Sequence, residues 1–336
     1  MIKFGVAGIP LTSKGRTYID SIIDVLNLGL NSLEVQLLRV NVNDTPATEY
    51  AGMYPKDVED SIIVDVLRPD ENGNYQSVGV ETEIEEDDIV QELFWNMARN
   101  YNELAEGMEL AKELDVDVSI HAPYYMDMLS DDEMAEKSIN HLKWAIIIGK
   151  AMGARRVITH TGFYHSGRES SMSRAISIYS DILKMYPADR GYPYIGVEAT
   201  SKSDIFGTVE ELLYLARAVK GIEPILNFPH IHSITNGSLI EPSNFSDLIE
   251  RFLPYAHGDL YTEFAGVDYE NGNEVKITAI KHGDLKFETL AEVLSVLDND
   301  MTIISMSPLL EHDAQYMQLM YMRSLLKKYQ KKTLKR

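Results

Sequence analysis

The sequence contains no cysteine among its 336 residues. Disulfide bonds and a thiolate nucleophile are therefore excluded, and so are zinc sites built from cysteine sulfur. Any metal site in this chain must be built from histidine, aspartate, glutamate and water. The positions of the nine histidines are for this reason informative.

Long hydrophobic runs are also missing. No window approaches the roughly 18 consecutive apolar residues of a membrane-spanning helix. The opening Met-Ile-Lys-Phe-Gly-Val-Ala-Gly-Ile-Pro lacks the charged segment and the following apolar segment of a secretory signal. We therefore expect a cytoplasmic protein with no membrane partner.

Positive charge is scarce, because 31 basic side chains stand against 52 acidic ones and the net charge is −21. Affinity for duplex DNA comes mainly from Lys and Arg side chains that displace counterions from the phosphates. This acidic surface repels DNA at long range, so DNA binding would require a local basic patch. The segment 326–336 is basic, and we expect it to be a frayed, solvated tail.

Eight short apolar segments alternate with segments of helical periodicity along the chain. Eight such pairs over this length predict an α/β fold, a single (β/α)8 TIM barrel covering residues 1–336. A doubly wound open sheet is the alternative, and it usually carries a glycine-rich phosphate-binding turn after its first strand. Because Gly5-Val-Ala-Gly8 does not complete that fingerprint, we favour the barrel.

Residues 41–88 interrupt the alternation and show no helical period. Two β-rich segments, 61–67 and 75–84, flank an Asn-Gly pair, which predicts an acidic β-hairpin-like insertion after the second strand. Between Asp57 and Glu92 there are thirteen acidic side chains and one basic one. The insertion is either a solvated charged face or an acidic lid over the active face of the barrel.

Helical periodicity returns at Asp88, the expected N-cap, and runs toward Leu114. A second hairpin-like segment is expected at residues 268–280, and an amphipathic segment at 311–328 ends the periodic part of the chain.

Five consecutive predicted strands end in side chains that can bind a metal ion or move a proton. In chain order these are His121, His160, Glu198, Asn227 with His230, and Glu263. The carboxyl ends of barrel strands meet at one face, so we expect these side chains to converge. His121, His160 and Glu198 supply the three protein ligands of a catalytic zinc site, and one zinc ion, or another divalent metal, is the expected cofactor. His230 is either a fourth ligand or a hydrogen-bonding group.

Motifs at these strand ends and elsewhere include His121-Ala-Pro-Tyr-Tyr, His160-Thr-Gly-Phe-Tyr, Glu198-Ala-Thr, Asn227-Phe-Pro-His-Ile-His and Ser307-Pro-Leu-Leu-Glu-His-Asp-Ala. Together they resemble archaeal members of the endonuclease IV family (AP endonuclease family 2), which belongs to the xylose-isomerase-like TIM barrels. The likeness spans nearly the whole chain apart from the acidic insertion. It implies a TIM barrel and a role in DNA repair, cleavage of the DNA backbone at abasic sites by a three-zinc centre.

Individual residues match the family's zinc ligands. By this resemblance, His121 and His160 match ligands of the first zinc, and Glu198 matches the carboxylate that bridges the first and second. Asn227 stands at the position of a second-zinc aspartate, and His230 matches a third-zinc ligand.

Other positions depart from the family pattern. Glu263 stands where the family has a histidine, and Met306 stands at its last-strand glutamate. Val275 and Ile277 stand at its Asp-x-His pair. The resemblance therefore implies an intact first metal site, a damaged second site and a third site close to abolished.

The leading hypothesis is a divergent endonuclease IV-like, metal-dependent hydrolase with one ion. Its substrate would be a small phosphorylated or sugar-like molecule, with DNA as a weak substrate at most. Glu198, Glu263 and His230 are the expected catalytic residues, and Glu263 or His230 would orient the attacking water or act as general base.

Three cationic side chains, Lys14, Arg168 and Lys202, are candidates for binding the anionic part of the substrate.

Two other classes of function stay open. A sugar or sugar-phosphate isomerase or epimerase would use paired glutamates, of which Glu198 is present while Met306 replaces the other. A non-catalytic binding protein would keep the barrel and use the acidic insertion for a partner. The number of bound metal ions separates these hypotheses, since three ions indicate the nuclease, one the single-metal hydrolase and none the binding protein.

Overall fold

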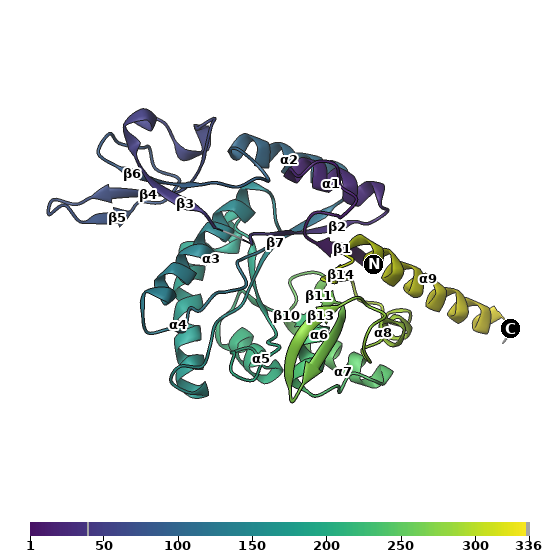
Figure 1. Ribbon diagram of the computed structural model, residues 1–336. Helices are drawn as coiled ribbons and strands as arrows, with labels where there is room; N and C mark the ends of the chain where they lie inside the picture. Colours follow the sequence, from purple (N-terminus) through teal and green to yellow (C-terminus); the bar gives the residue numbers. More distant parts are fainter. Residues whose placement is uncertain (39, 334–336) are drawn as a thin grey trace.

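Eight parallel strands pair edge to edge into a closed barrel in the computed structural model, which describes residues 1–38 and 40–333 (Figure 1). Their order around the barrel is β1-β14-β11-β10-β9-β8-β7-β2. The strands are β1 (Ile2–Ala7), β2 (Ser32–Gln36), β7 (Asp117–His121), β8 (Arg156–Thr159), β9 (Tyr194–Glu198), β10 (Ile222–Asn227), β11 (Leu260–Phe264) and β14 (Met301–Ser305). The predicted (β/α)8 TIM barrel is confirmed.

Helices follow the strands and cover the outside of the barrel (Figure 1). They are α1 (Tyr18–Asn27), α2 (Tyr101–Glu113), α3 (Glu133–Ala151), α4 (Arg168–Met185), α5 (Val209–Ala218), α6 (Phe228–Ile234), α7 (Pro242–Phe252), α8 (Phe287–Leu294) and α9 (Glu311–Thr333). Local sequence sets several of their starts, as at α5, where Thr208 and Glu211 form a reciprocal capping box. Within the described ranges, none of these helices has the length and apolar character needed to cross a membrane.

The insertion after β2 is a small antiparallel sheet rather than a single hairpin. Its strands, in the order β3-β6-β4-β5, are β3 (Val42–Pro46), β4 (Ile62–Pro69), β5 (Tyr75–Ser77) and β6 (Ile89–Leu93). The predicted hairpin is its β4–β5 pair, joined by the Asn-Gly turn. The sheet has its own small apolar core, which consists of Ala47, Val58, Ile63, Val66, Ile84 and Val90.

The helix predicted to start at Asp88 is wrong at its N-terminal end. Residues 89–93 form β6, which pairs with β3 on one side and β4 on the other. Backbone hydrogen bonds on both edges outweigh a weak helical period. Asp88 does not cap a helix and instead accepts two hydrogen bonds from Arg68, at 2.9 and 2.8 Å. α2 begins at Tyr101, with Asn100 as its N-cap.

The sequence predictions also concern the second hairpin and the C-terminal tail, and they have different outcomes. The hairpin expected at residues 268–280 is present as β12 (Gly266–Glu270) paired with β13 (Asn273–Thr278). The expected fraying of the C-terminal tail is wrong where the structure describes it, because α9 continues to Thr333. The last part of that predicted tail, 334–336, lies outside the described residues.

A buried ion cluster lies at the end of the barrel where the strands begin. Arg156 Nε lies 2.9 Å from Glu223 Oε2, and Arg156 Nη2 lies 3.2 Å from Asp259 Oδ1. Thr302 Oγ1 donates to Asp259 Oδ2 at 2.6 Å, and the guanidinium lies over the ring of Tyr261. Arg155 Nη1 also lies 2.9 Å from Asp259 Oδ1, so removal of Arg156 would leave Glu223 as the buried charge without a cation.

Replacement of Arg156 by methionine is expected to lower the free energy of unfolding by about 3–5 kcal/mol. Urea denaturation followed by circular dichroism measures it. Lys137→Met is the matched control, because Lys137 pairs with Glu133 on an exposed helix face and such pairs contribute about 0–1 kcal/mol. A loss below about 1 kcal/mol at Arg156 would show that the cluster is not a stabilising element.

Candidate metal centre

Strand register brings the predicted ligands to one end of the barrel. His121, Glu198 and Asn227 are the last residues of β7, β9 and β10, and His160 directly follows β8. Because parallel strands of a barrel end at a common face, side chains far apart in the sequence meet there. His230 does not lie at a strand end as predicted, since it belongs to the first turn of α6.

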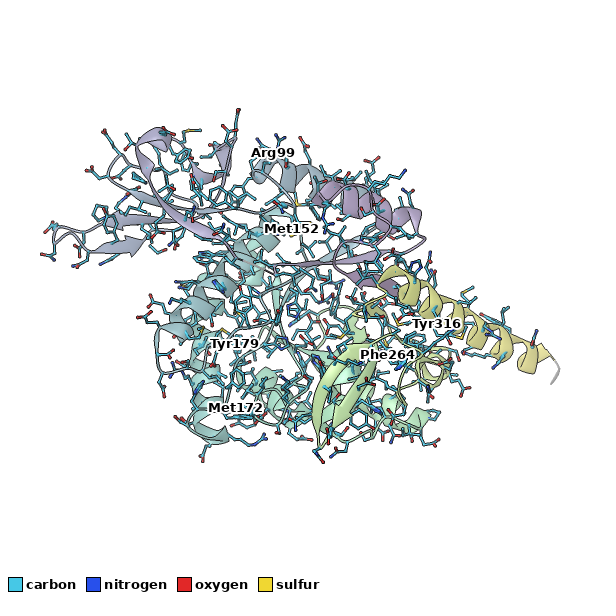
Figure 2. All side chains as sticks on the ribbon, in the orientation of Figure 1. Arg99, Met152, Met172, Tyr179, Phe264 and Tyr316 are labelled. Carbon is cyan, nitrogen blue, oxygen red and sulfur yellow. The ribbon has the colours of Figure 1, made fainter. Side chains whose placement is uncertain are left out.

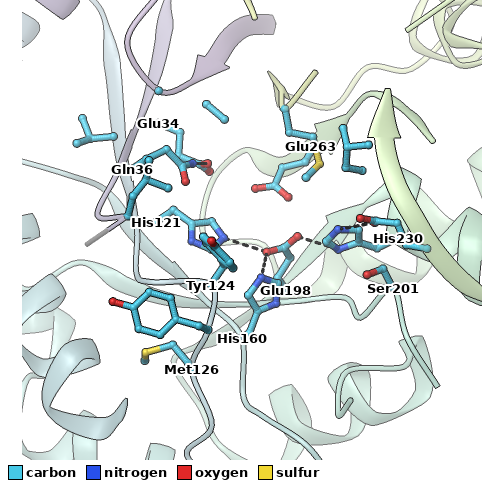
Figure 3. A pocket seen from close by; sticks show the side chains of 18 of the residues that line it. Glu34, Gln36, His121, Tyr124, Met126, His160, Glu198, Ser201, His230 and Glu263 are labelled. Carbon is cyan, nitrogen blue, oxygen red and sulfur yellow. Dashed lines mark hydrogen bonds and ion pairs between the residues drawn. The ribbon is translucent and has the colours of Figure 1, made fainter. Parts of the chain in front are cut away.

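Glu198 lies between three imidazole rings (Figure 3). Its Oε2 is 3.0 Å from His121 Nε2 and 3.2 Å from His160 Nε2, and its Oε1 is 3.0 Å from His230 Nδ1. One ligand atom from each of His121, His160 and Glu198 lies within 4.8 Å of the others. Tetrahedral zinc ligands at ~2.0–2.1 Å from the ion lie roughly 3.3 Å from each other, so this donor set fits one ion.

Backbone carbonyls orient two of the rings. His121 Nδ1 lies 2.5 Å from the carbonyl oxygen of Ala122, and His230 Nδ1 lies 2.9 Å from that of Ala199. With Nδ1 of His121 donating to a carbonyl, Nε2 is the nitrogen directed at the cluster, and it would bind a metal after losing its proton. Metal-ligating histidines in proteins are commonly held by this kind of hydrogen bond.

The backbone after β8 is shaped by a glycine. Gly162 has φ +133°, and a Cβ there would lie 2.3 Å from Asp127 Oδ1. Asp127 accepts a hydrogen bond from the backbone N–H of Phe163 at 3.1 Å and pairs with His165 at 2.7 Å. The motif His160-Thr-Gly therefore fits a tight turn that keeps His160 at the mouth of the barrel.

Burial and the charges of neighbouring groups shift the pKa values of Glu198 and His160 away from their usual ranges. Burial by itself would raise the pKa of Glu198, but His160, His230 and His121 hold it well below its usual range. Burial and the neighbouring imidazoles of His121 and His230 lower the pKa of His160 to about 4, against the opposing attraction of Glu198. His160 is therefore neutral near pH 7, the form in which an imidazole can bind a metal.

His121 behaves differently from His160. Burial acts to lower the pKa of His121, but the hydrogen bond to Glu198 and the charge of Glu34 raise it to about 9. Burial, together with the carboxylates of Glu198 and Glu34, raises the pKa of Glu263 well above its usual range. Glu263 therefore keeps its proton to a higher pH than an exposed glutamate does.

Asn227 occupies the space between two of the carboxylates. Its Nδ2 lies 2.5 Å from Glu198 Oε1 and 2.6 Å from Glu263 Oε2, with Met306 Sδ at 3.1 Å. The backbone N–H of His230 donates to Asn227 Oδ1 at 3.0 Å, which sets the direction of the amide. The Asn227 amide group therefore stands where a second cation would have to sit between Glu198 and Glu263.

Two acidic residues of the site, the buried Glu34 and the half-buried Glu274, were missed by the sequence analysis. Glu34 on β2 accepts hydrogen bonds from Tyr261 at 2.7 Å and Gln36 at 2.5 Å. Glu274 on β13 has its Oε2 3.3 Å from His230 Nε2. The available signal for Glu34 was a carboxylate between Leu33 and Val35 in a predicted strand, because a buried carboxylate is costly unless it is paired or serves a site.

Val275 and Ile277, which by resemblance stand at a pair of metal ligands, lie in different surroundings. Ile277 lines the cavity described below, while Val275 is 64% exposed and points elsewhere. Met306 also lines the cavity. None of these three side chains offers a nitrogen or oxygen ligand.

The cluster lies in a cavity of about 810 Å³. Its cationic lining side chains are Arg16 and Lys202, and within residues 1–38 and 40–333 neither is paired with a carboxylate. Tyr124 and Tyr125 after β7 and Phe163 after β8 add aromatic rings to the lining. The cavity thus combines a deep ligand cluster with unpaired positive charge and exposed rings.

Two of the three predicted anion-binding residues lie outside this cavity. Lys14 is exposed in the loop after β1 and does not line it. Arg168 does not line it either, because Tyr164 and Glu211 bind its guanidinium at 2.9 Å each. Lys202 does line the cavity, and Arg16 was overlooked because no pattern separates it from Lys14 in the same loop.

The acidic insertion does not contribute to the cavity either. Among the described residues, the lining passes from Leu38 to Met97 without any member of the insertion. The small sheet instead lies against α2 and α3, where Tyr101 donates to the carbonyl of Ile63 at 2.8 Å and Lys150 pairs with Glu81 at 3.1 Å (Figure 1). The lid interpretation finds no support in this placement, since docking against the side of the barrel leaves the mouth uncovered.

A family model described as the xylose isomerase-like TIM barrel matches residues 79–305. The chain belongs to this family. An uncharacterized protein of Methanocaldococcus jannaschii is 25% identical over 253 residues, which is 70% of this chain and 91% of that protein.

Solved structures with the same fold include enzymes of different activity. Endonuclease IV from Thermus thermophilus has a TM-score of 0.60 at 16% identity, over 96% of this chain and 99% of that chain. An L-ribulose 3-epimerase has a TM-score of 0.58 at 12% identity, over 99% of this chain and 98% of that chain. At these identities the likeness shows a common fold and leaves the activity to be argued from the site.

Proposed function

We propose that the protein is a single-metal hydrolase of the endonuclease IV type that acts on a phosphate-bearing substrate. The observation that carries this proposal is the convergence of His121, His160 and Glu198, whose ligand atoms lie within 4.8 Å of one another in a cavity with unpaired cations. Zinc is the ion we propose, because two imidazoles and one carboxylate are a common catalytic zinc set.

One ion, rather than several, agrees with the contacts around Glu198. The Asn227 amide donates to both Glu198 and Glu263, and this amide competes with a cation for the same two oxygens. Met306 beside it offers only a thioether. A bound divalent ion would supply Lewis acidity and an activated water.

The chain's own residues would bind and orient the substrate. They would also take up the proton that the attacking water loses. Arg16 and Lys202 are placed to hold an anionic group of the substrate. Glu263, which is buried and has a raised pKa, and His230, held by Ala199 and Glu198, are the groups we propose for proton transfer near the ion. Glu198 both binds the metal and keeps the three imidazoles in place.

Epimerisation is the less favoured activity. It needs two proton-moving groups on opposite sides of a sugar carbon, whereas the carboxylates of Glu34, Glu198 and Glu263 form one connected group. At the end of β14 the chain presents Met306 instead of a carboxylate. The cation pair in the cavity also fits a phosphate better than a neutral sugar.

A substrate panel tests the proposal. We expect protein depleted of metal by chelation and reloaded with zinc to hydrolyse bis(4-nitrophenyl) phosphate, and Glu198→Gln to reduce kcat/KM by at least about 100-fold. The same preparations are offered D-fructose and D-psicose, with the products separated by chromatography.

The control variant is Glu169→Gln in α4, an exposed carboxylate outside the cavity, which should keep full activity. Metal-dependent epimerisation of either sugar without phosphodiester hydrolysis would replace the hydrolase proposal with the epimerase. Absence of both activities in a metal-loaded protein would favour the binding protein.

A further inference from the structure

α9 exposes a row of large apolar side chains on the face turned away from the barrel. Leu319, Met322, Leu326 and Tyr329 have exposed fractions of 55%, 51%, 58% and 65%. The opposite face, with Ala314, Met317 and Met320, is buried against the body of the protein. In residues 1–38 and 40–333, α9 is therefore apolar on two sides, one buried against the body and one largely exposed.

The spacing of the exposed residues is regular. They follow one another at intervals of three, four and three, which places them on one stripe of a helix. The C-terminal part of α9 extends away from the barrel, past Tyr316 (Figures 1 and 2). A protruding helix with such a stripe can be approached by a second helix without a clash with the body.

Exposure of these four side chains is unfavourable, because removal of apolar surface from water is the main favourable term in protein association. Single exposed apolar residues need no explanation, but a contiguous row on one element marks an interaction site in a monomeric domain.

We propose that this stripe pairs with the same stripe of a second copy, with the two α9 helices antiparallel. The row is symmetric about position 324, so a two-fold axis there places Leu319 opposite the partner's Tyr329 and Met322 opposite the partner's Leu326. A single symmetry operation thus matches all four residues, as a two-fold interface requires.

The distribution of charge favours an antiparallel arrangement of the two helices. It also favours a second copy of this chain as the partner that covers the stripe. The segment 323–333 has five basic and no acidic residues, in a chain of net charge −21. Parallel helices would bring two basic segments together, whereas antiparallel helices lay each basic segment over the acidic body of the other copy. An interface confined to four side chains per copy is small, so we expect a weak, concentration-dependent dimer.

Sedimentation velocity of the full chain over a concentration series tests this inference. We expect a monomer–dimer equilibrium, and Met322→Glu should raise Kd by at least about tenfold because it places a charge in the apolar row. The double variant Met322→Glu with Leu326→Lys should restore dimerisation, since the antiparallel pairing sets these two positions opposite each other.

Two controls keep the result interpretable. Tyr214→Glu on α5, where the exposed fraction is 55%, should leave Kd unchanged. Circular dichroism and metal content should be those of the unmodified chain in every variant, which shows that the barrel is folded. A monomer at all concentrations, or a dimer that tolerates Met322→Glu, would overturn the proposal.

A membrane surface is the other occupant that an apolar and basic helix could contact. Flotation with vesicles of phosphatidylglycerol distinguishes it. Vesicle binding that Met322→Glu abolishes, in a chain that stays monomeric, would also overturn the dimer. No vesicle binding together with the restored double variant supports it.

Discussion

His160→Ala is expected to release the bound metal. Protein purified without added metal should contain about one equivalent of zinc, and the variant close to none after dialysis. The reason is that His160 is neutral near pH 7 and points its Nε2 at Glu198 Oε2, so its loss leaves two ligands. Loss of groups that only orient ligands already costs about 10–100-fold in affinity, so loss of a ligand should exceed this. Elemental analysis by mass spectrometry and titration with a zinc chelator measure it.

Two companion variants sharpen the metal experiment. His165→Ala should keep the full metal content, because His165 pairs with Asp127 outside the ligand cluster. Asn227→Asp should raise the content above one equivalent, because a third carboxylate would replace the amide between Glu198 and Glu263. Unchanged metal in His160→Ala would mean that the ion binds elsewhere.

Abasic duplex DNA is expected to bind weakly and to be cleaved at least about 1,000-fold more slowly than by an endonuclease IV with a complete three-metal site. The chain has a net charge of −21, and its cavity presents only Arg16 and Lys202 as unpaired cations within the described residues. The plot of log affinity against log salt should have a slope no steeper than about −2, as expected for two phosphate contacts.

The assay uses a labelled abasic oligonucleotide at low salt with added zinc and limiting protein. Lys202→Ala should reduce both binding and the salt slope, and Lys14→Ala should change neither, because Lys14 lies outside the cavity. Strand scission at a rate similar to a complete enzyme, abolished by His121→Ala, would refute this expectation. It would show that Glu263, Glu34 and Asn227 can support a multi-metal centre.

The local pattern of apolar and polar residues was sufficient to predict the barrel and the principal candidate metal ligands. The alternation of apolar and amphipathic segments reflects burial of each strand and of one helix face, which depends on neighbours in sequence. A polar residue that ends such a strand stands out against its surroundings, which is why His121, His160 and Glu198 were found. Local pattern failed at residues 89–93, where pairing with two other strands decided the conformation.

The sequence by itself therefore determined the fold and the types of donor atom available to a metal. Only the tertiary structure decided that Glu34 and Glu274 join the site, that Arg16 and Lys202 line it while Arg168 is bound to Glu211, and that the insertion leaves the mouth open. It also decided the direction of the Asn227 amide, through one backbone hydrogen bond from His230. These facts depend on barrel closure and on the paths of loops. Both bring together residues that are far apart in the sequence, and a local sequence pattern does not reveal such contacts.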